Sequence, residues 1–138
     1  MNSVEMLLLL IGLVAGHLVG DFLLQPKAMA IHKSDRGWKG FGWCVLHCLI
    51  YTTAVCGFIH NVVTPLVVVA IFLSHFPIDR WSLASQWLKL IRGRTFEAAY
   101  MSDSAYREFD IAFTSIVYTV VDSTWHLLFM FFGVLFVV

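Results

Sequence analysis

Four apolar stretches separated by three polar connections make up most of the chain. They cover residues 4–25, 41–60, 66–81 and 111–138. The first has roughly the length that an α-helix needs to cross the hydrocarbon core of a bilayer. We therefore expect an all-α fold: a polytopic membrane protein in which residues 1–138 form one four-transmembrane-helix bundle.

The stretch WSLASQWLKLI, residues 81–91, follows the third apolar run and mixes apolar with polar positions. It is expected to form a short cytoplasmic interfacial helix, with Trp81 and Trp87 in the headgroup region of the membrane. Pro26 is expected to end the first span, and Pro77 to kink the third.

Composition agrees with a membrane protein. Hydrophobic residues make up 59% of the chain and charged residues only 13%, whereas a soluble domain has about a quarter charged residues. The formal net charge is zero, which gives no reason to expect a nucleic-acid partner. Lys and Arg occur in the connections after the first and third spans and are absent from residues 61–65. The positive-inside rule therefore places both termini on the non-cytoplasmic side.

Small residues recur along the first span at Gly12, Gly16 and Gly20. Glycines four residues apart form a stripe on one helix face, where a second helix can approach closely. That second helix belongs either to the same chain or to another copy, so a homo-oligomer through this face is an alternative.

Every apolar span contains ionisable side chains, which are costly in hydrocarbon and mark functional positions. The set comprises His17, Asp21, His47, His75, Asp79, Asp122 and His126. Two pairs place a histidine four residues before an aspartate, and the pair in the last span has the reverse order. Because the last span runs in the opposite direction, a rise of about 1.5 Å per residue puts all seven at a similar depth in the cytoplasmic half.

Four histidines and three aspartates at one level of a helical bundle form a typical metal-site composition. Imidazole nitrogen and carboxylate oxygen suit Zn²⁺, with Fe²⁺ or Mn²⁺ as alternatives, and the set is large enough for one or two ions. The competing interpretation is that these residues hydrogen-bond to one another and hold the helices together.

Three further polar residues are candidates for binding a substrate: Gln25, Lys33 and Arg80. Gln25 continues the row of His17 and Asp21, and the two cations are expected at the cytoplasmic rim, where they could hold a lipid phosphate. The alternatives are that the cations only set the orientation of the protein and that Gln25 supports the metal ligands from outside.

The order and spacing of these residues resemble a known family. The resemblance rests on His17, Asp21, Gln25, Lys33, His47, His75, Asp79 and Arg80, within roughly the first 90 residues. These positions resemble DUF3307, an uncharacterised bacterial and phage membrane family. They are more loosely similar to small inner-membrane proteins described as LexA-regulated, membrane-bound metal-dependent hydrolases. The resemblance implies a location in the bacterial inner membrane.

The first functional hypothesis is a membrane-embedded hydrolase with a mono- or di-metal centre. It would act on a lipid or lipid-linked, phosphate-containing substrate near the cytoplasmic face, with Asp21 and Asp79 as catalytic residues. One alternative is a small transporter or proton/ion conductor that uses the same polar layer as a relay. Another is a phage-type exclusion or lysis protein in which the layer has only a structural role.

Overall fold

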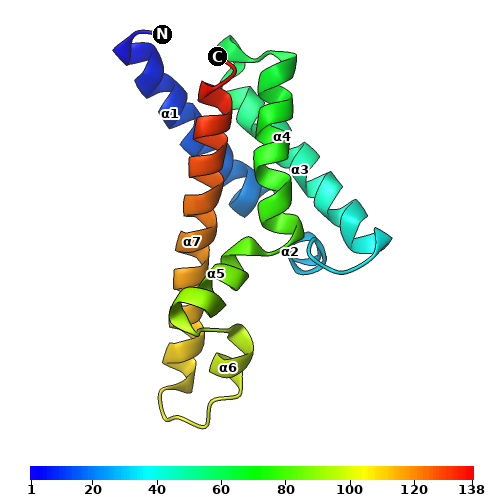
Figure 1. Cartoon of the computed structure of the whole chain (residues 1–138), viewed down its shortest axis with the longest axis vertical. Helices are drawn as coiled ribbons and strands as arrows, with labels where there is room; N and C mark the ends of the chain where they lie inside the picture. The colour runs from blue at the N-terminus through cyan, green and yellow to red at the C-terminus, as the bar shows by residue number, and fades with distance from the viewer.

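The computed structural model describes residues 1–138 and consists of helices without strands, which confirms the all-α prediction. Four long helices dominate it: α1 (Ser3–Leu18), α3 (Trp38–Phe58), α4 (Pro65–Arg80) and α7 (Arg107–Leu135). The chain termini lie close together at one end of the molecule (Figure 1).

Shorter elements connect the long helices. They are the π-helix η1 (Val19–Leu23), α2 (Lys27–His32), the 3-10 turn η2 (His60–Val62), α5 (Leu83–Arg92) and α6 (Phe96–Tyr100). Helices α5 and α6 pack against α7, at the end of the molecule opposite the termini (Figure 1). The expected short helix after the third apolar stretch is therefore present as α5, and it is strongly amphipathic.

Side-chain caps fix the start of two long helices. The Asn2 side chain accepts hydrogen bonds from the backbone N–H groups of Val4 and Glu5, while the Glu5 carboxylate accepts one from the Asn2 N–H. Thr64 accepts a hydrogen bond from the Val67 N–H, and Pro65 occupies the first turn of α4. Such caps satisfy backbone donors that have no partner within the helix.

The glycine stripe of α1 forms the contact with α3. A Cβ atom on Gly16 would lie 2.6 Å from the Cα of Val55, and one on Gly20 would lie 2.7 Å from the ring of Tyr51. The predicted close approach of a second helix is thus confirmed, and that helix belongs to the same chain. A homo-oligomer through this face would require α1 and α3 to separate.

Helix α4 packs against both α3 and α7, and α1 packs against α3 and α7. The interior between these helices holds the apolar core, which comprises Leu9, Leu13, Tyr51, Val55, Ile59, Val67, Ile71, Met130 and Val134. Many large apolar side chains also point outward, among them Leu8, Leu73 and Ile116, each about three-fifths exposed. A bundle that is apolar on both its inner and outer surfaces is typical of a membrane protein.

Three helical segments are long and apolar enough to cross a membrane: α1 with η1, α3, and α7. Helix α4 has 16 residues, about 24 Å, which is shorter than a hydrocarbon core of about 30 Å. It reaches sufficient length only together with α5, from which it is separated by a bend of 54°. The third predicted span is therefore a broken one.

The break lies after Arg80 and not at Pro77. Helix α4 continues through Pro77, and Ser82, in the left-handed conformation with φ 48°, begins the turn into α5. Helix α7 begins at Arg107, four residues before the predicted start, and α3 begins at Trp38, three residues early.

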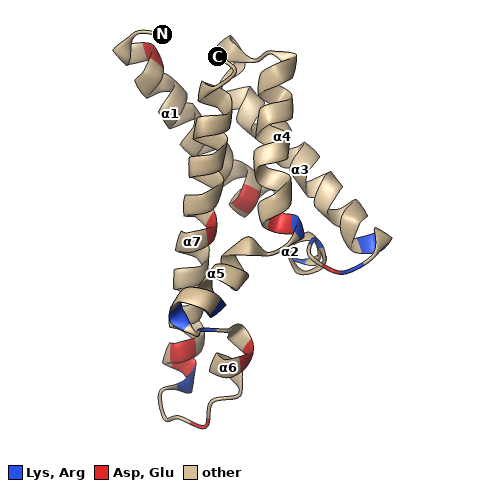
Figure 2. Cartoon of the chain, viewed as in Figure 1, with Lys and Arg blue, Asp and Glu red and all other residues tan.

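Charge is distributed unequally between the two ends of the molecule (Figure 2). All nine Lys and Arg residues fall within residues 27–39 and 80–107. The end that carries the termini has Glu5 as its only charged side chain. The Lys and Arg residues therefore lie away from the end that carries the termini.

Candidate metal centre

Seven histidine and aspartate side chains meet inside the bundle. They are His17 of α1, Asp21 of η1, His47 of α3, His75 and Asp79 of α4, and Asp122 and His126 of α7. The four histidines are at most 1% exposed. All seven residues predicted from the sequence are therefore brought together, and we call them the His/Asp cluster.

The π-helix η1 positions Asp21 between two helices. Its wider turn is closed by a hydrogen bond from the Leu24 N–H to the carbonyl of Val19, five residues back, at 2.9 Å. The two oxygens of Asp21 lie 3.1 Å from Nδ1 of His17 and 3.0 Å from Nε2 of His47. Single π-turns are rare in proteins, and those that occur are often found at functional sites.

Four side chains form the inner set of the cluster: Asp21, His47, His75 and Asp79. Nε2 of His47 lies 2.9 Å from Nε2 of His75, and 3.0 Å from both Asp21 Oδ1 and Asp79 Oδ2. Nε2 of His75 lies 2.9 Å from Asp79 Oδ2 and 3.6 Å from Asp21 Oδ1. A tetrahedral ion with bonds of about 2.0–2.1 Å separates its ligand atoms by about 3.3 Å. These five separations lie on either side of that value. The ligand atoms of Asp21, His47 and His75 form a group that could hold a cation, and Asp79 Oδ2 adjoins both histidines.

Two carboxylates connect the inner set to the rest of the cluster. Asp21 Oδ2 faces Nδ1 of His17 at 3.1 Å and Nδ1 of His126 at 4.0 Å, and Asp79 Oδ1 lies 3.6 Å from Nε2 of His126. Asp122 lies 3.4 Å from Nδ1 of His126. Each of the two carboxylates therefore faces the His47–His75 pair with one oxygen and His126 with the other, as expected of a bridging ligand.

Many polar atoms of the cluster are buried without a hydrogen-bond partner. Six of the seven such side-chain atoms in the chain belong to it: His17 Nε2, both Asp21 oxygens, His75 Nδ1, Asp79 Oδ2 and His126 Nε2. The contacts between carboxylates and imidazoles are short but poorly directed for hydrogen bonds. Because each unsatisfied buried group costs about 1–3 kcal/mol, the donor set fits a bound cation.

Two outer contacts orient the histidines. Nδ1 of His126 lies 2.9 Å from the backbone carbonyl of Asp122 and can donate to it, which leaves Nε2 with a free lone pair. The Tyr51 ring stacks on His75 with the centroids 3.7 Å apart, and its hydroxyl lies 3.1 Å from Nδ1 of His17. This hydroxyl also donates to the sulfur of Met130 at 3.4 Å. Neither Tyr51 nor Met130 is among the site residues predicted from the sequence. The signal that could have indicated them is that each lies four residues after a cluster histidine.

Lys33 lies inside the protein, not at the rim where the sequence placed it. Its Nζ is 2.7 Å from Oδ1 of Asp79, and the residue is 9% exposed. Burial alone would lower the pKa of Lys33, but the negative charges of Asp79 and Asp21 outweigh this effect and raise the pKa above its ordinary value. Lys33 is therefore a buried ammonium at the edge of the His/Asp cluster.

The other two predicted substrate-binding residues, Gln25 and Arg80, differ in where they lie relative to the His/Asp cluster. The Gln25 amide nitrogen lies 3.0 Å from Nδ1 and 3.1 Å from Nε2 of His47, so it contacts the imidazole of an inner-set residue. Arg80 is in contact with the connection before α3, where it donates to the carbonyl of Asp35 at 2.8 Å. Gln25 thus occupies a position that supports a ligand, whereas Arg80 lies outside the cluster.

Three overlapping groups within the cluster could hold a metal ion: Asp21 with His47 and His75, His75 with Asp79 and His126, and Asp21 with Asp122 and His126. The same side chains also make up a network of ion pairs. The geometry thus agrees with the predicted cofactor class, a cation held by nitrogen and oxygen ligands.

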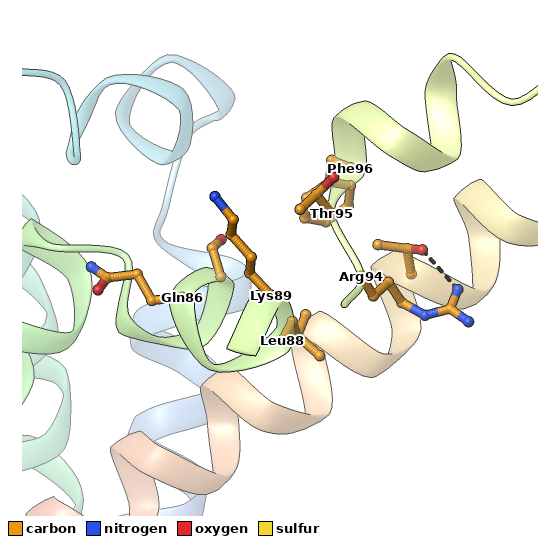
Figure 3. A pocket seen from close by; sticks show the side chains of 8 residues that line it. Gln86, Leu88, Lys89, Arg94, Thr95 and Phe96 are labelled. Carbon is orange, nitrogen blue, oxygen red and sulfur yellow. Dashed lines mark hydrogen bonds between the residues drawn. The ribbon is translucent and has the colours of Figure 1, made fainter. Parts of the chain in front are cut away.

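A separate pocket lies between α5, α6 and α7 (Figure 3). Its volume is about 200 Å³, and Lys89, Thr95 and Phe96 are among the residues that line it. Arg94, also in the lining, donates to the hydroxyl of Thr114 at 3.1 Å. No histidine or aspartate lines this pocket, so it is distinct from the His/Asp cluster.

The model of one protein family, described as "Protein of unknown function (DUF3307)", matches residues 8–137. The match extends past the 90 residues on which the resemblance rested and includes the α7 pair Asp122 and His126. No curated protein and no solved structure matches the chain.

Proposed function

We propose that this chain, which belongs to the DUF3307 family, is a membrane-embedded, metal-dependent hydrolase. Its His/Asp cluster would bind a divalent metal ion and act on a lipid or lipid-linked, phosphate-containing substrate. The observation that carries the proposal is the convergence of ligand atoms from Asp21, His47 and His75, which lie 2.9–3.6 Å apart. Asp79 Oδ2 adjoins both histidines at 2.9–3.0 Å.

The membrane placement is supported by the three apolar helical segments, by the bent pair α4 and α5, and by the outward-facing apolar side chains. We propose four crossings, with the end that carries all nine Lys and Arg residues on the cytoplasmic side. Both termini would then be non-cytoplasmic, in the inner membrane of a bacterium. Asp79 lies next to the last residue of α4, so in this proposal it would lie near the cytoplasmic side, where a substrate headgroup could be reached.

The residues of the cluster divide into two roles in this proposal. His47 and His75 would fix the ion through Nε2, while Asp21 and Asp79 would neutralise it and present oxygens toward the reacting group. A divalent ion bound there supplies a water of lowered pKa and polarises a phosphoryl oxygen. Zn²⁺ is the preferred candidate because two imidazoles and two carboxylates suit four-coordination, with Fe²⁺ and Mn²⁺ as alternatives.

The surroundings of the cluster support a phosphate-containing substrate. Lys33 carries a buried positive charge at its edge, and Arg80 directly follows Asp79 in the chain. Asp21 and Asp79 are the catalytic candidates because each faces two histidine groups at once. Gln25 would support His47 if its amide turned to accept the Nδ1 proton, and its 3.1 Å contact with Nε2 would then give way to the ion.

The test is elemental analysis of the purified protein in detergent. We expect stoichiometric Zn, Fe or Mn in the wild type, and its loss in His47→Ala and in His75→Ala. His60→Ala is the matched control, because this histidine lies in η2, outside the cluster. Well-folded wild-type protein without metal would refute the proposal. Release of phosphate or of a headgroup from lipid substrates by the metal-loaded protein then tests the hydrolase activity.

One observation favours a second candidate, a proton relay. Contacts of 2.7–3.1 Å run without interruption from His17 through Asp21, His47 and Asp79 to Lys33. Chains of titratable groups within a membrane can conduct protons. Proton flux through liposomes that contain metal-free protein would support this candidate, whereas flux no faster than in empty liposomes would exclude it.

A further inference from the structure

The ammonium of Lys33 occupies one side of the bridge that Asp79 forms. Asp79 directs Oδ2 to His47 and His75, at 3.0 Å and 2.9 Å. Its other oxygen, Oδ1, lies 2.7 Å from Lys33 Nζ and 3.6 Å from Nε2 of His126. In a two-metal centre that second oxygen would bind the second ion, but here it is already paired with a cation.

Formal charge also favours one divalent ion over two. The buried cluster contains three carboxylates, on Asp21, Asp79 and Asp122, and Lys33 supplies one positive charge. With neutral imidazoles, one divalent ion brings the total to zero, whereas two divalent ions would leave a charge of +2. Uncompensated charge in a low-dielectric interior is costly. The cluster with Lys33 in place is therefore balanced for one ion.

Lys33 is held in this position by the connection between the first two long helices. Its backbone N–H donates to the carbonyl of Met29, and Met29 is 3% exposed. Asp35 lies two residues after Lys33, and its carbonyl accepts a hydrogen bond from the guanidinium of Arg80. A Cβ on Gly40 would collide with the same carbonyl. The segment that carries Lys33 is thus fixed to α3 and α4 by these contacts.

We propose that the Lys33 ammonium takes the place of a second metal ion, so that the His/Asp cluster binds one divalent ion per chain, in the inner set. This inference rests on the proposed metal binding and defines its stoichiometry. The carboxylate of Asp79 then bridges a metal ion and an ammonium. His17, Asp122 and His126 surround the inner set without binding an ion of their own.

Metal content per chain tests this inference without any assay of activity. Purified protein is loaded with excess Zn²⁺, passed through a desalting column and analysed for zinc and for protein. We expect one zinc per chain in the wild type and two in Lys33→Met, because Oδ1 of Asp79 loses its cationic partner in that variant. Two ions would then leave a formal charge of +1, against +2 in the wild type. Lys39→Met, which removes an exposed lysine from the first turn of α3, is expected to keep one.

The variant Lys33→Arg retains a cation and is expected to bind one zinc. Two zinc ions in the wild type would overturn the inference whether or not Lys33→Met folds, and so would a single or absent zinc in folded Lys33→Met. A folded wild type without zinc would overturn the proposed metal binding itself, so the two failures are distinguishable.

Discussion

The Nε2 atoms of His47 and His75 lie 2.9 Å apart in the interior of the bundle. Two facing imidazole nitrogens can share only one proton, and both also lie within 3.0 Å of the same Asp79 oxygen. A cation among these atoms would use both nitrogen lone pairs at once. Because the histidines belong to α3 and α4, such a cation would also tie two helices together.

Removal of the metal is therefore expected to destabilise the protein. A ligand that binds only the folded state at 100 times its Kd adds about 2.7 kcal/mol to the free energy of unfolding. Chelation should lower the thermal midpoint of the metal-loaded wild type in detergent, and re-addition of the metal should restore it. The variant His75→Ala should melt at the same temperature with and without chelator; an equal shift in both proteins would contradict the account.

The contact between α1 and α3 is expected to tolerate no side chain at Gly16. A methyl group there would lie 2.6 Å from the backbone of Val55, so Gly16→Ala should lower the free energy of unfolding by roughly 1–3 kcal/mol. Gly42→Ala is the control, because a Cβ at that helical position meets no atom within 4 Å. Denaturation of both variants by SDS would measure the difference, and equal stability would contradict a tight helix contact.

The hydroxyl of Tyr51 is expected to affect metal affinity through His17. Tyr51→Phe keeps the ring that stacks on His75 but removes the contact with Nδ1 of His17. Loss of such an outer partner typically weakens metal binding 10- to 100-fold. Competition with a chelating dye would measure the Kd, and the exposed Tyr106→Phe should bind like the wild type. Unchanged affinity in Tyr51→Phe would contradict this prediction and would mean that Tyr51 only packs against the cluster.

The turn between α4 and α5 is expected to favour glycine. Ser82 has φ 48° and ψ 50°, a conformation that costs a non-glycine residue about 1–2 kcal/mol. Ser82→Gly should therefore match or exceed the wild type in thermal stability, and Ser82→Val should fall below it. Ser85→Gly, within helix α5, should be destabilised by about 1 kcal/mol. A lower midpoint for Ser82→Gly than for the wild type would contradict a left-handed turn at this position.

Much of the cluster could be predicted because helix geometry links spacing to position. Residues four apart share a helix face, so His17 with Asp21 and His75 with Asp79 were expected to act as pairs. The reversed order of Asp122 and His126 matched the opposite direction of α7. The glycine stripe likewise indicated a close helix contact, although not which helix would provide it.

Other features depend on tertiary structure and could not be read from the sequence. Lys33 follows a short polar segment and resembles any lysine at a membrane rim; only the packing of α2 against α3 turns it inward. The π-turn at Asp21 carries no residue pattern of its own. The break after Arg80 depends on a left-handed serine, whereas Pro77 is the more obvious breaker in the sequence and is accommodated within α4.

Anomalous X-ray scattering from crystals of the metal-loaded protein tests the central claim most directly. Data collected on both sides of the zinc absorption edge should show one strong peak per chain, surrounded by Nε2 of His47, Nε2 of His75, Oδ1 of Asp21 and Oδ2 of Asp79. The same peak should be absent from crystals of His75→Ala. A well-ordered inner set without a peak, or a peak bound only by surface residues, would contradict the account.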